Sequence, residues 1–499
     1  MEVRAFPLSF DGFRLLSESL VPPDDLHLNP HSTPISILDD DSLLNIFRLY
    51  CQALLDGDES DGGPVIGGWK WERVRWWYNL VHVCRRWRHL VLSSASHLGL
   101  CLLCTHGTPV ADMLAHSPPF PLVLDHYYRH TTASDIEQIL LTLQYRDRVR
   151  RIRIIKAVPI VEEFIAAIDD EFPMLESLCI APEHNTSLAL PKTFQAPRLR
   201  HLILSNLAHP MGSPPLLGAA DLVTLSLSNL SYTYFGPDAL LGWVLLLPRL
   251  ETLWIDFYSP FPSADVERDL MHMRNMTYVT HPTLCNFTFR GVIMYLEAFL
   301  SRITAPHLDV LHIKFFIHPT FSVPYLLEFM SMSENLRFRS AQLSFGDDGV
   351  TITACPHETV ALSPFSLRIL NARFDLQVSS AARILYVLSP VFSSVVDLTL
   401  KYQRCSCEAW AECQNENEAD LARWRTILRS FHNVDTLRIP SDLVTVLSRS
   451  LQPNGESPMD LFPRLKELIY SASSMTGDAF TGFINARQNA GCPVTLIRN

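Results

Sequence analysis

The 499-residue sequence predicts a mixed fold, α+β and α/β, in which a short N-terminal helical segment precedes a curved solenoid of strand–helix units. Two patterns predict this fold class. Apolar residues near the N-terminus recur at helical spacing, and farther along a motif of alternating apolar residues returns mostly every 23 to 28 residues. The composition agrees, because 47% hydrophobic and 19% charged residues are typical of a chain that folds around a core.

Charge and hydropathy exclude several function classes. The net charge of −11 argues against a general nucleic-acid-binding protein. The sequence contains no run of 18 or more apolar residues, and its first residues lack the apolar core of a signal peptide. We therefore expect no membrane span and no secretion, and place the protein in the cytoplasm, the nucleus or both.

The eleven cysteines are expected to be reduced, and those in apolar segments, namely Cys84, Cys179 and Cys285, to be buried. The motif "CLLCTH" at 101–106 lacks the histidine that haem attachment requires directly after the second cysteine. The motif "CSCEAWAEC" at 405–413 lacks a fourth metal ligand at a known spacing. We expect no metal and no cofactor.

An enzyme is also not expected. The sequence contains no phosphate-binding loop, no dinucleotide fingerprint and no nucleophile elbow. A catalytic triad assembled from residues far apart in the sequence stays open as an alternative.

The first helix is predicted over residues 35–50, after a loose leader at 1–33. Asp39 to Asp41 supply the N-cap and acidic residues for the first turn, where the positive end of the helix dipole favours negative charge. Apolar residues then follow at helical spacing, beginning at Leu43. An inserted acidic loop over about 51–76 separates this helix from the next.

The second helical signal is "NLVHVCRRWRHLV" at 79–91. One face of this predicted helix is apolar and the other is basic. The apolar face comprises Leu80, Val83, Cys84, Trp87 and Val91, and the basic face comprises His82, Arg85, Arg86 and His89.

Together these two segments resemble an F-box, whose pattern is L-P-x-E/D-x-L-x-x-I-F followed by V-C-[RK]-x-W. The opening matches at Leu38, Asp39, Asp41, Leu43, Leu44, Ile46 and Phe47, and the closing at Val83, Cys84, Arg85 and Trp87. Two departures are Asp39 in place of the usual proline and the long inserted loop. Such insertions occur in F-box proteins of mushroom-forming fungi, which the chain resembles overall.

The resemblance implies that residues 34–98 form a hook of short helices that packs against a helical adaptor of the Skp type, and through it joins a cullin. The arginines would lie at the rim of this contact, where charge affects encounter rate and partner choice more than affinity. The adaptor-binding residues that the resemblance implies are Leu38, Leu43, Leu44, Ile46, Phe47, Val83 and Trp87.

The remaining chain carries the internal repeat, of the form P-x-L-x-x-[LF]-x-[LIFY], as in "APRLRHLIL" at 196–204 and "LPRLETLWI" at 247–255. The proline ends the preceding segment, and the alternating residues make a short strand with one buried face. One strand and one helix cannot bury that face alone, so neighbouring repeats stack. We call the residue at the first apolar position of each repeat its anchor. The first anchors are Val149, Leu175, Leu199, Leu222, Leu250, Leu284 and Leu308.

This period and motif are those of a leucine-rich repeat, which we assign to residues 147–499 with a connecting segment at 99–146. The asparagine expected three residues after the last leucine is absent, since Glu183, Leu207, Leu230 and Tyr258 stand there. An even horseshoe is therefore not expected. The register over 336–375 is not assigned, and a single irregular α/β domain with coincidental repeats is the alternative.

Two functions follow from this organisation. The first is the substrate-recognition subunit of a Skp–cullin–F-box type ubiquitin ligase, in which the F-box binds the adaptor and the repeats bind a protein target. The second is a repeat scaffold for protein binding without a ligase role, in which the helices only cap the array. The target stays unidentified. Residues between the buried strand positions are the predicted target contacts: Trp254, Asp256, Asn286, Arg290, His312, Lys314, Lys401 and Arg438.

Overall fold

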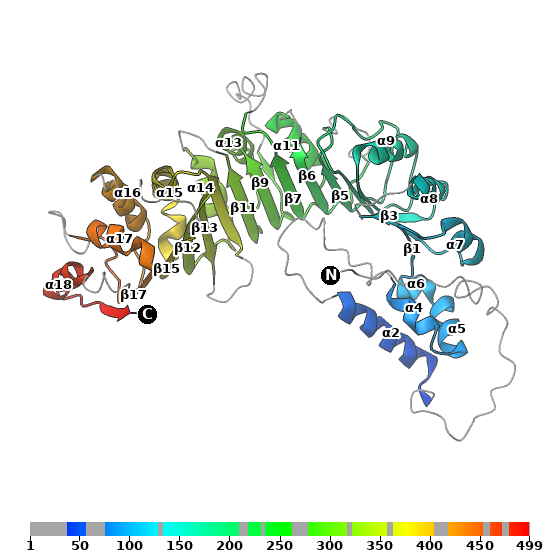
Figure 1. The fold of residues 1–499 in the computed structure, drawn as a ribbon, viewed down its shortest axis with the longest axis horizontal. Coiled ribbons are helices and arrows are strands. Elements are labelled where there is room, and N and C mark those ends of the chain that lie inside the picture. The colour runs from blue at the N-terminus through cyan, green and yellow to red at the C-terminus, as the bar shows by residue number, and fades with distance from the viewer. Residues whose placement is uncertain are drawn as a thin grey trace. The chain divides into compact units, whose positions relative to one another are not determined.

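The computed structural model describes residues 37–55, 75–127, 133–208, 218–230, 235–261, 278–316, 322–356, 363–403, 418–452, 460–471 and 479–498. The expected leader at 1–33 and the cysteine motif at 405–413 lie outside these residues, as does most of the acidic loop. The chain divides into an N-terminal unit, residues 1–226, and a C-terminal unit, residues 227–499. Figure 1 shows both units and labels many of their elements.

Among the described residues, the N-terminal unit starts with four helices, which we call the hook: α2 (Asp40–Leu55), α4 (Trp76–Val81), α5 (Arg85–Ser93) and α6 (Ala95–Leu98). Helix α2 begins and ends five residues later than predicted, so the expected loop starts after Leu55. The single helix predicted over 79–91 is wrong, because Cys84 is extended, with φ −158° and ψ 170°, and separates α4 from α5.

The rest of the N-terminal unit is a parallel sheet of β1 (Leu102–Thr105), β2 (Leu122–His126), β3 (Val149–Lys156), β4 (Ser177–Pro182) and β5 (His201–Ser205), paired in chain order. Helices α7 (Val110–His116), α8 (Ala133–Leu143) and α9 (Val158–Ala167) alternate with the first strands. Residues 99–146 are therefore not a connection, since they supply the first two strand–helix units. Strands β1 and β2 lack the proline–leucine motif, but almost all of the side chains in these two strands are buried.

Strand β6 (Thr224–Leu230) spans the boundary between the two units, and the C-terminal unit continues the same kind of repeat. Strands β7 (Thr252–Phe257), β9 (Asn286–Gly291) and β11 (Val310–Phe315) pair in parallel. Helices α11 (Pro237–Leu246), α13 (Ile293–Leu300) and α14 (Pro324–Met332) accompany them, and β8 (Val279–Thr280) pairs with β10 (Ile303–Thr304) in a separate small sheet.

The parallel order is interrupted at β12 (Ser340–Gly346), β13 (Gly349–Cys355) and β14 (Phe365–Leu370). The spatial order is β11-β14-β13-β12-β15, and β13 runs antiparallel to both of its neighbours. A Cβ on Gly349 would lie 2.2 Å from the carbonyl oxygen of Ile369, so this crossing needs glycine. The reversal explains why a repeating register could not be assigned over 336–375.

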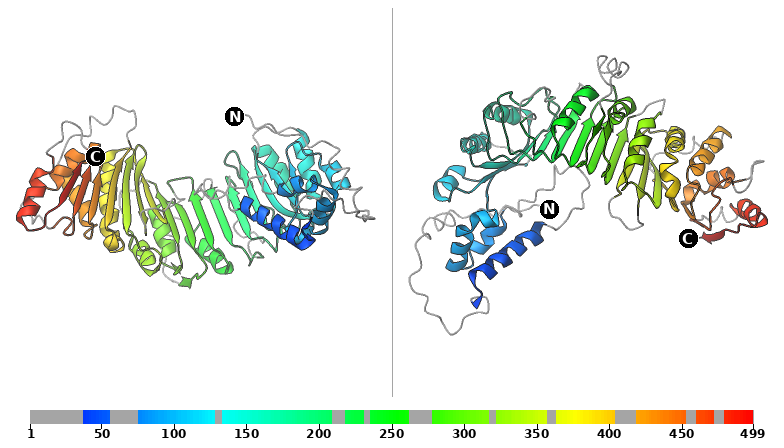
Figure 2. Two further views of the ribbon diagram at one scale, coloured as in Figure 1. Left: turned by 90° about the horizontal axis from the view of Figure 1, so that it is seen from below. Right: turned by 180° about the vertical axis from the view of Figure 1, so that it is seen from behind.

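The parallel order then resumes in β15 (Asp397–Tyr402), β16 (Thr436–Ile439), β17 (Glu467–Tyr470) and β18 (Thr495–Arg498). Helices of the C-terminal unit line one side of its strands (Figure 2). The other side of the sheet is called the open face below. The later helices are α15 (Phe374–Leu388), η2 (Val391–Ser394), α16 (Glu418–Arg429), η4 (Ser441–Leu443), α17 (Val444–Ser450) and α18 (Thr481–Asn489).

The predicted repeat register is confirmed by burial, because all seven first anchors, from Val149 to Leu308, are fully buried. Strand side chains alternate as expected: Leu253, Ile255 and Phe257 are buried, whereas the residues between them are half-buried. Phe257 also meets Tyr295 of α13, with ring centroids 4.9 Å apart. Each strand therefore contributes one face to a core shared with the helices.

In two of the repeats an asparagine lies one residue before the position where the motif would have it, directly after β5 and near the end of β6. Asn206 and Asn229 both adopt positive φ, 57° and 50°. The Asn206 side-chain nitrogen Nδ2 donates to the carbonyl of Pro182 in the preceding repeat at 2.7 Å. Asparagine tolerates this left-handed conformation better than most residues. Asn206 therefore ends β5 and connects two neighbouring repeats.

Candidate protein-interaction surfaces

The N-terminus of α2 is capped by Asp39, as predicted. Its Oδ1 accepts a hydrogen bond from the Ser42 backbone N–H at 2.6 Å, and its carbonyl accepts the first helical bond from Leu43. The Ser42 backbone N–H, followed by the Ser42 side chain, lowers the pKa of Asp39, because both donate to the charged carboxylate. This cap fixes where the apolar face of α2 begins.

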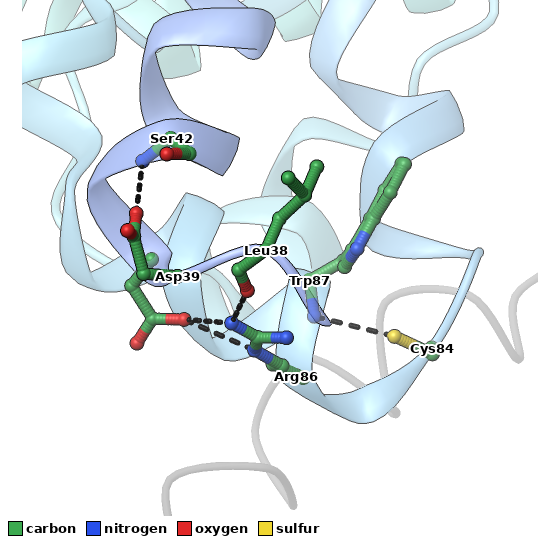
Figure 3. Close-up of polar contacts among 7 residues, drawn as sticks. Leu38, Asp39, Ser42, Cys84, Arg86 and Trp87 are labelled. Carbon is green, nitrogen blue, oxygen red and sulfur yellow. Dashed lines mark hydrogen bonds and ion pairs between the residues drawn. The ribbon is translucent and has the colours of Figure 1, made fainter. Parts of the chain in front are cut away.

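Arg86 ties the start of α2 to the start of α5 (Figure 3). Its Nη2 donates to the carbonyl of Leu38 at 2.5 Å and to Oδ1 of Asp40 at 2.8 Å, and its Nε donates to the same oxygen at 3.0 Å. The F-box resemblance implied that the arginines lie at the rim of a partner contact, which stays a prediction. Arg86 holds two helices of the hook together.

Cys84 has a structural role that the sequence did not indicate. Its sulfur accepts a hydrogen bond from the Trp87 backbone N–H at 3.5 Å and caps α5 (Figure 3). The expectation that Cys84 is buried is wrong, because an N-cap lies at the helix end, and this thiol is exposed. Cys285 is half-buried rather than buried, whereas Cys179 is buried as expected, which raises the pKa of its thiol to about 12.

The predicted adaptor contacts fall into three groups by exposure. Leu43 and Phe47 are buried, and Phe47 packs edge-on against Trp87 with ring centroids 4.8 Å apart. These two side chains therefore belong to the interior of the hook. The half-buried residues are Leu38, Leu44 and Trp87, and the exposed ones are Ile46 and Val83.

Several large apolar side chains of the hook face solvent. Ile46, Leu49 and Tyr50 share one face of α2, since they are three and four residues apart. Val83, in the turn between α4 and α5, is 58% exposed, and Ile37 precedes α2. We call these five residues the hook surface. Exposed apolar patches of this kind are typical of protein-interaction sites.

Trp77 anchors the hook to the first repeat. Its indole Nε1 donates to the carbonyl of Cys101 at 3.2 Å, and its ring meets the ring of Phe120 edge-on at 5.9 Å. Trp77 is fully buried. The helices and the first strands of the N-terminal unit are therefore joined by a packed contact.

The second surface is the open face of the C-terminal unit. Register places Asp256, Arg290, Lys314 and Arg368 side by side on β7, β9, β11 and β14. The adjacent row contains Trp254, Thr288, His312 and Ser366. Five of the predicted target contacts are thereby brought together.

The other predicted target contacts lie apart from this group. Asn286 pairs with Thr252 at the start of β7 and β9. Lys401 pairs with Ser344, beyond the antiparallel strands, and is exposed. Arg438 lies farther along, 3.8 Å from Asp397.

Charges on the open face influence one another. Arg290 lies 3.5 Å from Oδ1 of Asp256, and Arg368 donates to Asp348 with its Nη2 at 2.5 Å. Burial raises the pKa of Asp256 to about 6, against the opposing effect of Arg290. Burial also lowers the pKa of Lys314, and Arg290 and Arg368 lower it further because they are cations.

Arg368 and Asp348 were not predicted as site residues, because the repeat register over 336–375 was not assigned from the sequence. The alternation of apolar residues in "FSLRIL" at 365–370 indicates a strand with one buried face, and this pattern could have identified Arg368. Phe365, Leu367 and Ile369 are buried, so Arg368 must lie on the opposite face.

Within the described ranges, no three metal-binding side chains come together. No helix in the described part of the chain is both long enough and apolar enough to cross a bilayer.

No protein-family model matches the chain, and no curated protein matches it. Among solved structures, the chain is similar to the leucine-rich repeat-containing protein LegL7 from Legionella pneumophila. The sequence identity is 13% and the TM-score 0.27, over 72% of this chain and 96% of LegL7.

Proposed function

We propose that this protein is the substrate-recognition subunit of a Skp–cullin–F-box type ubiquitin ligase in the cytoplasm or nucleus. The hook binds a Skp-type adaptor, and the repeats hold a protein target. The observation that carries the proposal is the hook surface: large apolar side chains left exposed on helices that match the F-box pattern.

The roles of the hook residues follow from their exposure. Leu43 and Phe47 support the helices from within, while Ile46, Leu49 and Val83 supply the apolar centre of the adaptor contact. Basic residues such as Arg85 lie at the rim and influence the association rate. The protein itself performs no chemical step, because it acts by holding the target close to a charged conjugating enzyme.

Co-purification with a Skp-type adaptor tests this assignment. The double variant Ile46→Asp with Val83→Asp places two charges in the contact, and we expect adaptor retention to fall at least tenfold. Tyr386→Asp is the matched control, because Tyr386 is an exposed apolar residue on α15 in the other unit. Adaptor retention by the double variant at the level of the control would refute the assignment.

A protein-binding scaffold without a ligase role is the second candidate. The observation that favours it is the contact of Trp77 with Cys101 and Phe120, by which the hook covers the first repeat as a cap would. Deletion of residues 34–98 separates the two functions. A pure cap predicts an unstable array and no adaptor binding by the whole chain, whereas an F-box predicts adaptor binding that the deletion removes.

A further inference from the structure

Three cations occupy directly neighbouring positions on the open face. Arg290 of β9 pairs in register with Lys314 of β11, and Lys314 pairs with Arg368 of β14. Neighbouring strands lie about 4.8 Å apart, and like charges opposite one another destabilise a sheet. This row therefore carries an electrostatic cost within the folded chain.

The carboxylates beside the row form ion pairs only with the arginines at its ends. Asp256 lies next to Arg290, and Asp348 accepts from Arg368. In the part of the chain that the structure describes, no carboxylate lies within ion-pair distance of Lys314. Two carboxylates beside three cations leave one net positive charge in the row. Asp256 and Asp348 also attract the Lys314 ammonium, but neither forms an ion pair with it.

We propose that Lys314 is the receptor for one side-chain carboxylate of an extended acidic segment in the protein target. This inference rests on the proposed function and names the chemistry of what the repeats recognise. A single carboxylate matches the single uncompensated charge. A phosphate carries a charge of about −1.5 to −2, which exceeds the single net positive charge of the row, and it would be repelled by Asp256 and Asp348.

Neighbouring residues give the receptor its shape. The guanidinium of Arg290 lies over the ring of Phe316, 5.3 Å from its centroid, which holds that side chain in place. Trp254 lies in the adjacent row and is half-buried, so part of its surface faces outward. An apolar residue next to the acidic one in the target would contact this tryptophan. The sheet face therefore fits an extended segment with an acidic and an apolar residue close together.

Fluorescence anisotropy with the full chain tests the receptor. The probe is a fluorescein-labelled peptide, Gly-Ser-Glu-Leu-Glu-Leu-Ser-Gly, compared with the same peptide carrying glutamine for glutamate and with one carrying phosphoserine for glutamate. We expect the glutamate peptide to bind, the glutamine peptide to bind at least fivefold more weakly, and the phosphoserine peptide to bind no more tightly than the glutamate peptide.

The matched variants are Lys314→Gln and Lys466→Gln. Only Lys314 is flanked by two arginines in register, whereas Lys466 is an exposed lysine of the same unit that lies outside the strands. Lys314→Gln should lose at least fivefold in affinity with an unchanged or higher melting temperature, and Lys466→Gln less than twofold. Equal losses in both variants, no loss in Lys314→Gln, tighter phosphoserine binding, or no binding at about 1 mM protein would each overturn the proposal. Adaptor binding is measured separately, by co-purification. Failure of the ligase assignment would therefore appear as unchanged adaptor retention and not as a change in peptide affinity.

Discussion

The edge of the Phe47 ring meets the indole of Trp87 at a centroid distance of 4.8 Å and an interplanar angle of 64°. This contact joins the first helix of the hook to α5, across the inserted loop. Aromatic pairs in this geometry stabilise beyond the burial of their area. The two segments that match the F-box pattern therefore pack against each other within this chain.

Phe47→Ala should destabilise the hook by about 3–5 kcal/mol, because it removes a fully buried aromatic side chain. Adaptor binding would be lost as a consequence of unfolding. Hydrogen–deuterium exchange of peptides from α2 and α5 measures this, with exposed Ile46→Ala as the control. Protected α2 and α5 amides in the Phe47 variant would show that the aromatic pair is dispensable.

Cys84→Ser should leave α5 at least as stable as in the wild type, because serine caps helices well. Cys84→Ala should cost about 1 kcal/mol, because the Trp87 backbone N–H loses its acceptor. Exchange rates of the amides in the first turn of α5 distinguish the two variants. Identical rates in both would argue against a capping role for the sulfur.

Trp77→Phe should loosen the junction between hook and repeats by about 1–2 kcal/mol, since it keeps an aromatic ring but leaves the Cys101 carbonyl without its donor. Trp77→Ala should cost more, because it also leaves a cavity beside Phe120. Limited proteolysis over residues 94–101 is the readout. Cleavage at the wild-type rate in the alanine variant would contradict a packed junction.

Glu297 should make the stability of the C-terminal unit depend on pH. Its carboxylate accepts from the backbone N–H groups of Tyr325 and Leu326 at the start of α14, at 2.9 and 3.0 Å. Burial nevertheless raises its pKa from 4.5 to about 7. The folded state therefore binds more protons than the unfolded state between these values, and the free energy of unfolding falls as pH rises through this window.

The substitution Glu297→Gln removes that titration. Relative to the variant, the wild type should lose at most about 3 kcal/mol of stability between pH 4.5 and pH 7. Urea denaturation at several pH values measures the free energy of unfolding of both proteins. Taking the difference between the two removes the contribution of the titrating groups that they share. A difference independent of pH would refute the shifted titration.

Much of the repeat architecture could be predicted from local pattern. Anchors such as Leu199 and Leu250 are buried because alternation puts one strand face against the helices, and alternation is visible in the sequence. The strands at 102–105 and 122–126 were missed, since a strand buried on both faces shows no alternation.

Several features of the hook and of the charged row could not be predicted from the sequence. Apolar spacing over 79–91 predicted one helix, but spacing does not reveal that Cys84 turns the chain and begins another. Arg86 and Arg368 acquire their roles from contacts with residues distant in sequence or in an unassigned register. Such contacts depend on tertiary packing, which a local pattern does not encode.

The antiparallel crossing of β12, β13 and β14 also affects how the chain folds during synthesis. A simple repeat array can add each strand to the preceding one as it leaves the ribosome. Here the strand that pairs with β11 is β14, so the edge of β11 stays uncovered until Leu370 has emerged. Uncovered strand edges pair readily with other chains. This strand edge is therefore open to mispairing with other chains for longer than it would be in a simple repeat array.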